Sequence, residues 1–127
     1  MIPAKKVLVI DDEDHIREVA EVSLEAVGGW RVFTAGSGRE GVSVAASERP
    51  DAILLDVMMP ELAGPATVGR LQADPQTRDI PVILLTAKVQ PADHRRFEGL
   101  GVAAVLAKPF DPMTLPGQVS AALGWSA

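Results

Sequence analysis

The sequence predicts a doubly wound α/β domain, in which a parallel sheet is covered by helices on both faces. Short runs of Val, Ile and Leu recur with almost no polar alternation, which is typical of parallel strands buried on both sides. Segments with apolar residues at helical spacing lie between these runs, so strand and helix alternate five times. A chain of 127 residues suffices for one such domain, and we expect a single domain over residues 1–127.

Five runs predict the strands. Four of them are almost wholly apolar, and they cover residues 7–10, 52–55, 82–85 and 102–107. The remaining run, residues 30–35, interleaves Arg31 and Thr34 with apolar side chains and is therefore expected at a sheet edge.

Five segments predict the helices. Their apolar positions fall within residues 16–27, 42–46, 65–71, 91–100 and 115–122. Gly28-Gly29 ends the first helix, and Asp111-Pro112 is interpreted as a cap and a first-turn proline of the last. Pro116 predicts a late start or a kink in that helix. Right-handed crossovers and five units of this size favour the flavodoxin-like strand order 2-1-3-4-5.

Composition excludes several classes of protein. A net charge of −5 disfavours direct nucleic-acid binding, and the absence of cysteine excludes disulfide scaffolds and thiolate metal sites. The apolar stretch near the N-terminus is too short for a signal peptide, and no stretch is long enough to span a bilayer. We therefore expect a cytoplasmic protein without membrane insertion.

Polar residues follow the predicted strands at the edge where such folds bind ligands. Asp11 and Asp12 follow the first run, Asp56 the third, Thr86 the fourth and Lys108 the fifth. Three neighbouring carboxylates repel one another, and Mg²⁺, which prefers carboxylate, water and phosphate oxygens, relieves that repulsion. The ammonium group and the hydroxyl can bind phosphate oxygens. This set of groups suits phosphoryl transfer to a carboxylate nucleophile.

With these residues in place, the chain from about Lys5 to Leu123 resembles the receiver domains of two-component response regulators, in particular stand-alone chemotaxis-type receivers. Each matching motif is weak alone, and the set in this order is highly specific. The motifs are Asp11-Asp12, the Asp56-Val-Met-Met-Pro run, Gly64, Thr86-Ala87 and Lys108-Pro109-Phe110.

The resemblance implies a role for each residue. Asp56 is the expected phosphoacceptor, and a sensor histidine kinase or phosphotransfer protein is the expected donor. Asp12, Asp56 and the Met58 main-chain carbonyl are expected to hold Mg²⁺, with Asp11 reaching it through water. Lys108 is expected to pair with the phosphate from a cis Lys108-Pro109 peptide, and Thr86 to move towards it as the switch hydroxyl.

The resemblance also implies a signalling protein rather than an enzyme, although it assists its own phosphorylation and dephosphorylation. The signal is expected on the face formed by the fourth helix, fifth strand and fifth helix, for an unknown protein target. Val105 stands where the family often has an aromatic partner of the threonine, so a subtler shift of this face is expected. Met58 cannot orient an attacking water, which predicts slow loss of the phosphoryl group.

Other interpretations remain open. The domain could be a phosphate-independent pseudo-receiver, and Asp12 could cap the first helix. An aspartyl-phosphate phosphatase usually needs a second acid two residues after the nucleophile, where this chain has Met58. A flavodoxin-like FMN protein needs a hydroxyl-rich loop where this chain has two acids. The run from Gly36 to Gly41 fits the dinucleotide fingerprint, but dinucleotide binding leaves four polar residues without a role, namely Asp11, Asp12, Thr86 and Lys108.

Overall fold

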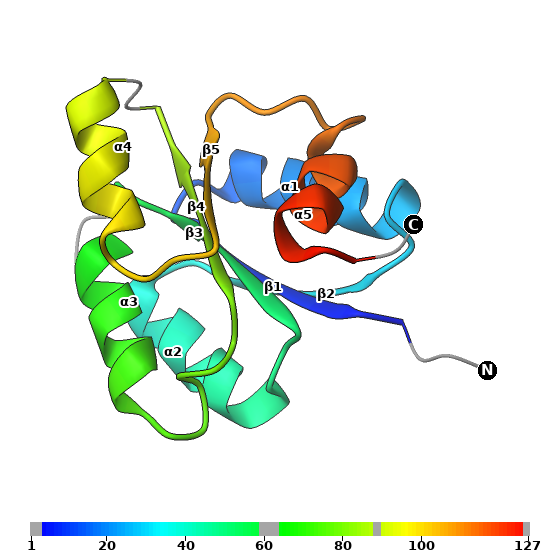
Figure 1. Cartoon of the computed structure of the whole chain (residues 1–127). Helices are drawn as coiled ribbons and strands as arrows, with labels where there is room; N and C mark the ends of the chain where they lie inside the picture. Colours follow the sequence, from blue (N-terminus) through cyan, green and yellow to red (C-terminus); the bar gives the residue numbers. More distant parts are fainter. Residues whose placement is uncertain (1–3, 59–63, 88–89, 126–127) are drawn as a thin grey trace.

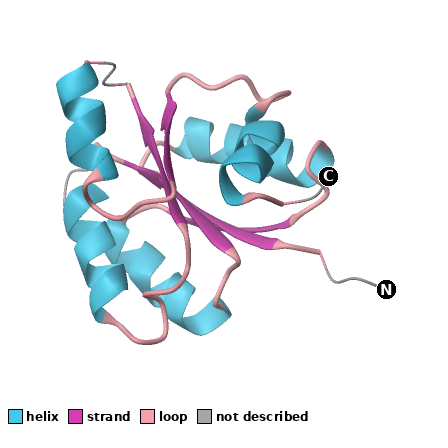
Figure 2. Ribbon diagram, in the orientation of Figure 1, coloured by secondary structure: helices cyan, strands magenta, loops and turns pink. Residues whose placement is uncertain are grey.

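A computed structural model describes residues 4–58, 64–87 and 90–125, and these form a parallel sheet between two layers of helices (Figures 1 and 2). The strand order is β2-β1-β3-β4-β5, which confirms the predicted flavodoxin-like topology. The strands are β1 (Lys6–Ile10), β2 (Arg31–Ala35), β3 (Ala52–Asp56), β4 (Val82–Thr86) and β5 (Ala104–Ala107).

Helices cover both faces of the sheet. They are α1 (Asp14–Ala26), α2 (Gly38–Glu48), α3 (Gly64–Ala73), α4 (Pro91–Glu98) and α5 (Leu115–Leu123). Figure 1 shows α1 and α5 on one face and α2, α3 and α4 on the other. None of the described helices is both long and apolar enough to cross a membrane.

Two apolar clusters, one on each face of the sheet, form the core. Along β1, Leu8 and Ile10 belong to the cluster under α2, α3 and α4, whereas Val7 and Val9 belong to the cluster under α1 and α5. Successive side chains of a strand point to opposite faces, so a strand covered on both sides must be apolar at every position. This is why the central strands appear in the sequence as unbroken apolar runs.

The last strand and the last helix differ from the prediction. β5 begins at Ala104 rather than at residue 102, after Gly101 in a left-handed conformation. The prediction that Asp111 caps α5 is wrong, because the cap residue of α5 is Thr114, and Asp111 accepts the main-chain N–H of Met113 at 2.9 Å in the turn before the helix. The helix starts at Leu115, and Pro116 occupies its first turn, which confirms the predicted late start.

The glycine-rich run that resembles a dinucleotide fingerprint forms the start of α2. Ser37 caps this helix by accepting the N–H of Glu40 at 3.1 Å, and the Glu40 carboxylate accepts the N–H of Gly36 at 3.0 Å. Gly41 lies against β1, where an added Cβ would come within 2.3 Å of Ile10 Cδ1. These residues therefore form a helix cap and a close helix–sheet contact.

Candidate functional site

The predicted site residues meet at one edge of the sheet because their strands are parallel and hydrogen-bonded in register. Asp56 pairs with Leu85 of β4, and Thr86 of β4 pairs with Ala107, the residue before Lys108. Asp11 immediately follows β1, which lies beside β3 on the side opposite to β4. All of these positions thus lie at the carboxyl ends of adjacent strands, where doubly wound sheets bind ligands.

Asp11 is buried and held by hydrogen bonds at each of its polar groups. Its N–H donates to Ala35 O at 3.1 Å, and its carbonyl accepts from Arg17 Nη1 at 2.8 Å. Its carboxylate accepts the Glu13 N–H at 2.9 Å and Lys108 Nζ at 2.9 Å. The prediction that Asp12 caps α1 is wrong, because Glu13 is the cap residue and makes no side-chain cap bond.

Asp56 ends β3 with only 3% of its surface exposed. Its Oδ1 accepts the Met58 N–H at 3.3 Å and lies 3.3 Å from Lys108 Nζ. Gly64, the first residue of α3, donates its N–H to Val57 O at 3.0 Å, and a Cβ at Gly64 would lie 2.8 Å from Val57 Cα. A glycine is therefore required where α3 starts against the end of β3. Met59 and Pro60 of the predicted motif lie outside the described residues.

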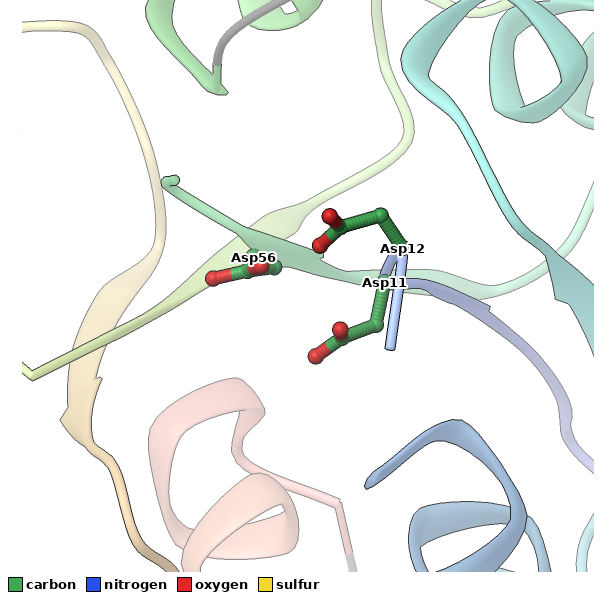
Figure 3. A group of neighbouring side chains, drawn as sticks. All are labelled: Asp11, Asp12 and Asp56. Carbon is green, nitrogen blue, oxygen red and sulfur yellow. The ribbon is translucent and has the colours of Figure 1, made fainter. Parts of the chain in front are cut away.

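The carboxylates of Asp11, Asp12 and Asp56 each offer an oxygen, and these oxygens lie within 4.8 Å of one another. Figure 3 shows Asp11 and Asp12 projecting from the end of β1 towards the side on which Asp56 lies. Asp12 is exposed and makes no hydrogen bond or ion pair to another described residue. Hard oxygen donors with excess negative charge fit a divalent cation such as Mg²⁺.

Burial and charge perturb both partners of the central ion pair. Burial, together with the neighbouring Asp11 charge, raises the pKa of Asp56 to about 6, although Lys108 opposes the shift. Burial lowers the pKa of Lys108, but its hydrogen bond and charge interactions with Asp11 and Asp56 outweigh this and raise that pKa above its usual value. Lys108 therefore stays positive, and one ammonium group does not fully compensate the carboxylates.

A cleft of about 270 Å³ opens beside this group and is lined by residues that include Asp56, Met58, Ala87, Lys108 and Pro109. The Lys108-Pro109 peptide is cis, as predicted. Thr86 is buried at the end of β4, and its carbonyl accepts the Lys108 N–H at 2.9 Å. The Asp56 carboxylate and the Lys108 ammonium group therefore face one small open cavity.

The raised pKa of Asp56 predicts a pH-dependent stability without divalent cations. The folded state binds the Asp56 proton more tightly than the unfolded chain does, so this contribution to stability is full below about pH 4 and is lost as the pH rises through about 6. Asp56→Asn cannot ionise, so its advantage over the parent should grow to about 3 kcal/mol by about pH 8. Urea unfolding in EDTA, followed by the fluorescence of Trp30 and Trp125, measures the difference. An advantage that stays constant between about pH 5 and about pH 8 would contradict the shift.

A family model describes the same region of sequence. The model for the response regulator receiver domain matches residues 7–120, which is most of the chain. The chain belongs to the response regulator receiver domain family. Receiver domains of response regulators are signalling proteins of two-component systems, so the resemblance inferred from the motifs is confirmed.

Individual relatives agree with this assignment. The receiver chain is 38% identical over 121 residues to the phosphate regulon transcriptional regulatory protein PhoB of Pseudomonas aeruginosa, covering 94% of this chain and 52% of PhoB. It spans about half the length of the curated relatives it matches.

Solved structures of receiver domains share the fold closely. The chemotaxis protein CheY4 of Vibrio cholerae is 32% identical with a TM-score of 0.87, over 94% of this chain and 98% of CheY4. The receiver domain of the sensor histidine kinase PA1611 from Pseudomonas aeruginosa is 30% identical with a TM-score of 0.84, over 95% and 98% of the two chains. That relative has a magnesium ion coordinated in its active site cleft.

The structure of this receiver domain brings together the predicted Asp11, Asp12, Asp56 and Lys108, with Thr86 at the adjacent strand end. Sequence reasoning missed Arg17, whose guanidinium reaches back to the carbonyl of Asp11. The available signal was its position six residues after that acid, which brings its side chain back to the start of α1. The role of the Met58 main-chain carbonyl as a metal ligand stays a prediction.

Proposed function

We propose that the chain is a phosphorylation-dependent switch whose acceptor is Asp56. The observation that carries the proposal is the position of Asp56 at the cleft, with its Oδ1 3.3 Å from Lys108 Nζ. A carboxylate poised beside an ammonium group can bring an incoming phosphoryl group into contact with both. With a pKa of about 6, the acceptor is mostly ionised, and thus nucleophilic, at neutral pH.

The reaction is a phosphoryl transfer. An Asp56 carboxylate oxygen attacks phosphorus, a new P–O bond forms, and the bond from phosphorus to the donor breaks with its electron pair leaving on the donor. With phosphohistidine the broken bond is P–N, and with acetyl phosphate it is P–O. Lys108 is placed to pair with a phosphate oxygen, which would replace part of its present interaction with the carboxylates.

Mg²⁺ is the proposed cofactor, and it supplies charge neutralisation and orientation of phosphate oxygens when bound. Asp12, Asp56 and the Met58 carbonyl would bind it, with Asp11 acting through water. Two observations support a cation here: the cluster of three carboxylate oxygens, and a pKa of Asp56 that is raised despite the nearby ammonium group.

We propose that Thr86 transmits the change to the face formed by α4, β5 and α5. β5 is an edge strand of the sheet, and the Thr86 carbonyl accepts a hydrogen bond from the main-chain N–H of Lys108, the residue that follows β5. Val105, opposite Leu84 in the neighbouring strand, packs against the core cluster under α2, α3 and α4. A small displacement of β5 would therefore take the place of the rotation of an aromatic side chain at position 105. A downstream protein would bind the displaced face.

A protein phosphodonor is the proposed partner, in the form of a histidine kinase or a phosphotransfer protein. An apolar groove of about 460 Å³ lies between α1 and the segment before α5, and it is lined by residues that include Val22, Val27 and Met113. Val22 is 62% exposed, and α1 also supplies Ile16 to the cleft beside Asp56. An exposed apolar surface along the helix that also lines the cleft suits contact with a partner protein.

The test of this function is incubation with Mg²⁺ and acetyl phosphate, followed by intact-mass measurement. The parent is expected to gain one phosphoryl group only when Mg²⁺ is present, and Asp56→Asn is expected to gain none. Asp79→Asn, which changes an exposed acid outside the cleft, serves as the matched control and should behave as the parent. Uptake by Asp56→Asn would assign the acceptor elsewhere.

The same experiment separates the remaining alternatives. No uptake by the parent would favour a phosphate-independent pseudo-receiver module. Rapid repeated hydrolysis of the donor would favour a phosphatase, which the exposed and apolar Met58 side chain beside Asp56 disfavours. For the switch, Met58 predicts an acyl phosphate that decays more slowly than in Met58→Asn.

A further inference from the structure

Arg17 lies beneath the acidic loop that follows β1. Its Nη1 donates to the main-chain carbonyl of Asp11 at 2.8 Å, and its Nη2 pairs with Asp14 Oδ1. The side chain is only 21% exposed, although it belongs to the first turns of a surface helix. A rigid guanidinium bound on two sides is held in one orientation.

The contact with Asp11 bears on the position of Asp12. The Asp11 carbonyl belongs to the peptide that joins these two residues, and a peptide is planar. Fixing the direction of that carbonyl therefore fixes the plane from which Asp12 begins. Asp12 makes no hydrogen bond or ion pair to another described residue, so its carboxylate depends on the backbone for its position.

The neighbouring turn leaves room for the guanidinium. Gly36 lies between β2 and α2, and a Cβ there would lie 3.3 Å from Arg17 Nη1. Gly36 is itself held by the Glu40 carboxylate, and Ala35 binds the N–H of Asp11 at 3.1 Å. The main chain of Asp11 is therefore held at its N–H by Ala35 and at its carbonyl by Arg17.

We propose that Arg17 is a positioning residue for the divalent cation of the acidic site. By holding the Asp11–Asp12 peptide, it presents the Asp12 carboxylate towards Asp56 before the cation arrives, which lowers the cost of binding. Loss of a group that orients a metal ligand commonly lowers metal affinity by about 10- to 100-fold. The inference rests on the proposed function, because it takes the three acids as the metal site.

The test is calorimetric titration of the intact chain with Mg²⁺ alone. Arg17→Met keeps most of the aliphatic stem and removes the donors, and it is expected to bind Mg²⁺ about tenfold more weakly. Arg17→Lys, which can still donate to the Asp11 carbonyl, should recover part of the loss. Asp14→Ala removes the exposed partner of Arg17 and keeps its bond to the Asp11 carbonyl, so it should weaken Mg²⁺ binding less than Arg17→Met does.

Two further measurements distinguish positioning from a general loss of stability. In acetyl phosphate reactions, the Mg²⁺ concentration for half-maximal phosphorylation of Arg17→Met should rise, while the rate at saturating Mg²⁺ stays near that of the parent. Gly36→Ala keeps Arg17 and displaces its guanidinium by a few tenths of an ångström, so it should weaken Mg²⁺ binding to a smaller degree.

Unchanged Mg²⁺ affinity in folded Arg17→Met would overturn the inference, as would unchanged affinity in Gly36→Ala if Arg17→Met does not fold. A parent that binds no Mg²⁺ would overturn it as well. A parent that binds Mg²⁺ but accepts no phosphoryl group would refute the proposed switch alone, because the titration does not depend on phosphorylation.

Discussion

Lys108→Met is expected to lower the free energy of unfolding by about 3–5 kcal/mol near neutral pH in EDTA. Lys108 Nζ lies 2.9 Å from Asp11 Oδ2 and 3.3 Å from Asp56 Oδ1, and both carboxylates are buried. Removing the ammonium group leaves two like charges facing each other without a counter-charge. Breaking a buried ion pair in this way costs far more than breaking an exposed pair.

The pH dependence of the variant follows from the same interaction. Lys108 lowers the pKa of Asp56 in the parent, so its loss should raise that pKa above about 6. The folded variant then binds the Asp56 proton even more tightly than the unfolded chain does, and its stability should fall over a wider range as the pH rises. Urea unfolding from about pH 5 to about pH 8 measures this, and Mg²⁺ should restore part of the loss.

Arg96→Met is the matched control for this prediction. It breaks the pair between Arg96 and Asp93, in which the nitrogen and oxygen lie 3.5 Å apart and the arginine is mostly exposed. An exposed pair of this kind contributes about 0–1 kcal/mol, so little change is expected. Equal losses of unfolding free energy in Lys108→Met and Arg96→Met would show that the burial of Asp11 and Asp56 has little energetic consequence.

Gly41→Ala is expected to destabilise the domain by about 2 kcal/mol, although alanine is the better helix former. The new Cβ would lie 2.3 Å from Ile10 Cδ1 and 2.7 Å from Ile10 Cγ1, at a fully buried point between α2 and β1. Neither element can yield easily, because Ile10 is enclosed in the core cluster under α2, α3 and α4. Overpacking of this kind typically costs about 1–3 kcal/mol.

Gly69→Ala provides the opposite expectation from the same substitution. Gly69 lies within α3, and nothing comes within 4 Å of the position its Cβ would take. The alanine should therefore stabilise the helix by about 0.5–1 kcal/mol.

A second variant tests the contact at Gly41. Ile10→Val in the Gly41→Ala background removes the closest atom, Ile10 Cδ1, and should recover part of the stability lost in Gly41→Ala. A stabilising Gly41→Ala would mean that α2 can move away from the sheet at little cost.

The sequence alone was sufficient to predict the topology and the main candidates for the site. A strand buried on both faces has to be apolar at every position, so β1, β3 and β4 were visible as unbroken runs. Parallel strands end at the same edge of the sheet, so residues that follow different runs were expected together. Asp11, Asp56 and Lys108 meet for this reason.

Tertiary structure alone decided features that depend on contacts between distant segments. The run from Gly36 to Gly41 fits a nucleotide loop locally, and only the approach of Ile10 shows that Gly41 is required for packing. Asp111 and Asp12 are both favourable cap residues, but Asp111 bonds to the Met113 N–H in a turn before α5, and the cap residue of α1 is Glu13. Arg17 had an ordinary helical position, and its contact with the Asp11 carbonyl arises from the way α1 folds back on the end of β1. Local patterns specify strands, helices and their order, whereas the partner of each polar group is set by the packing of the whole chain.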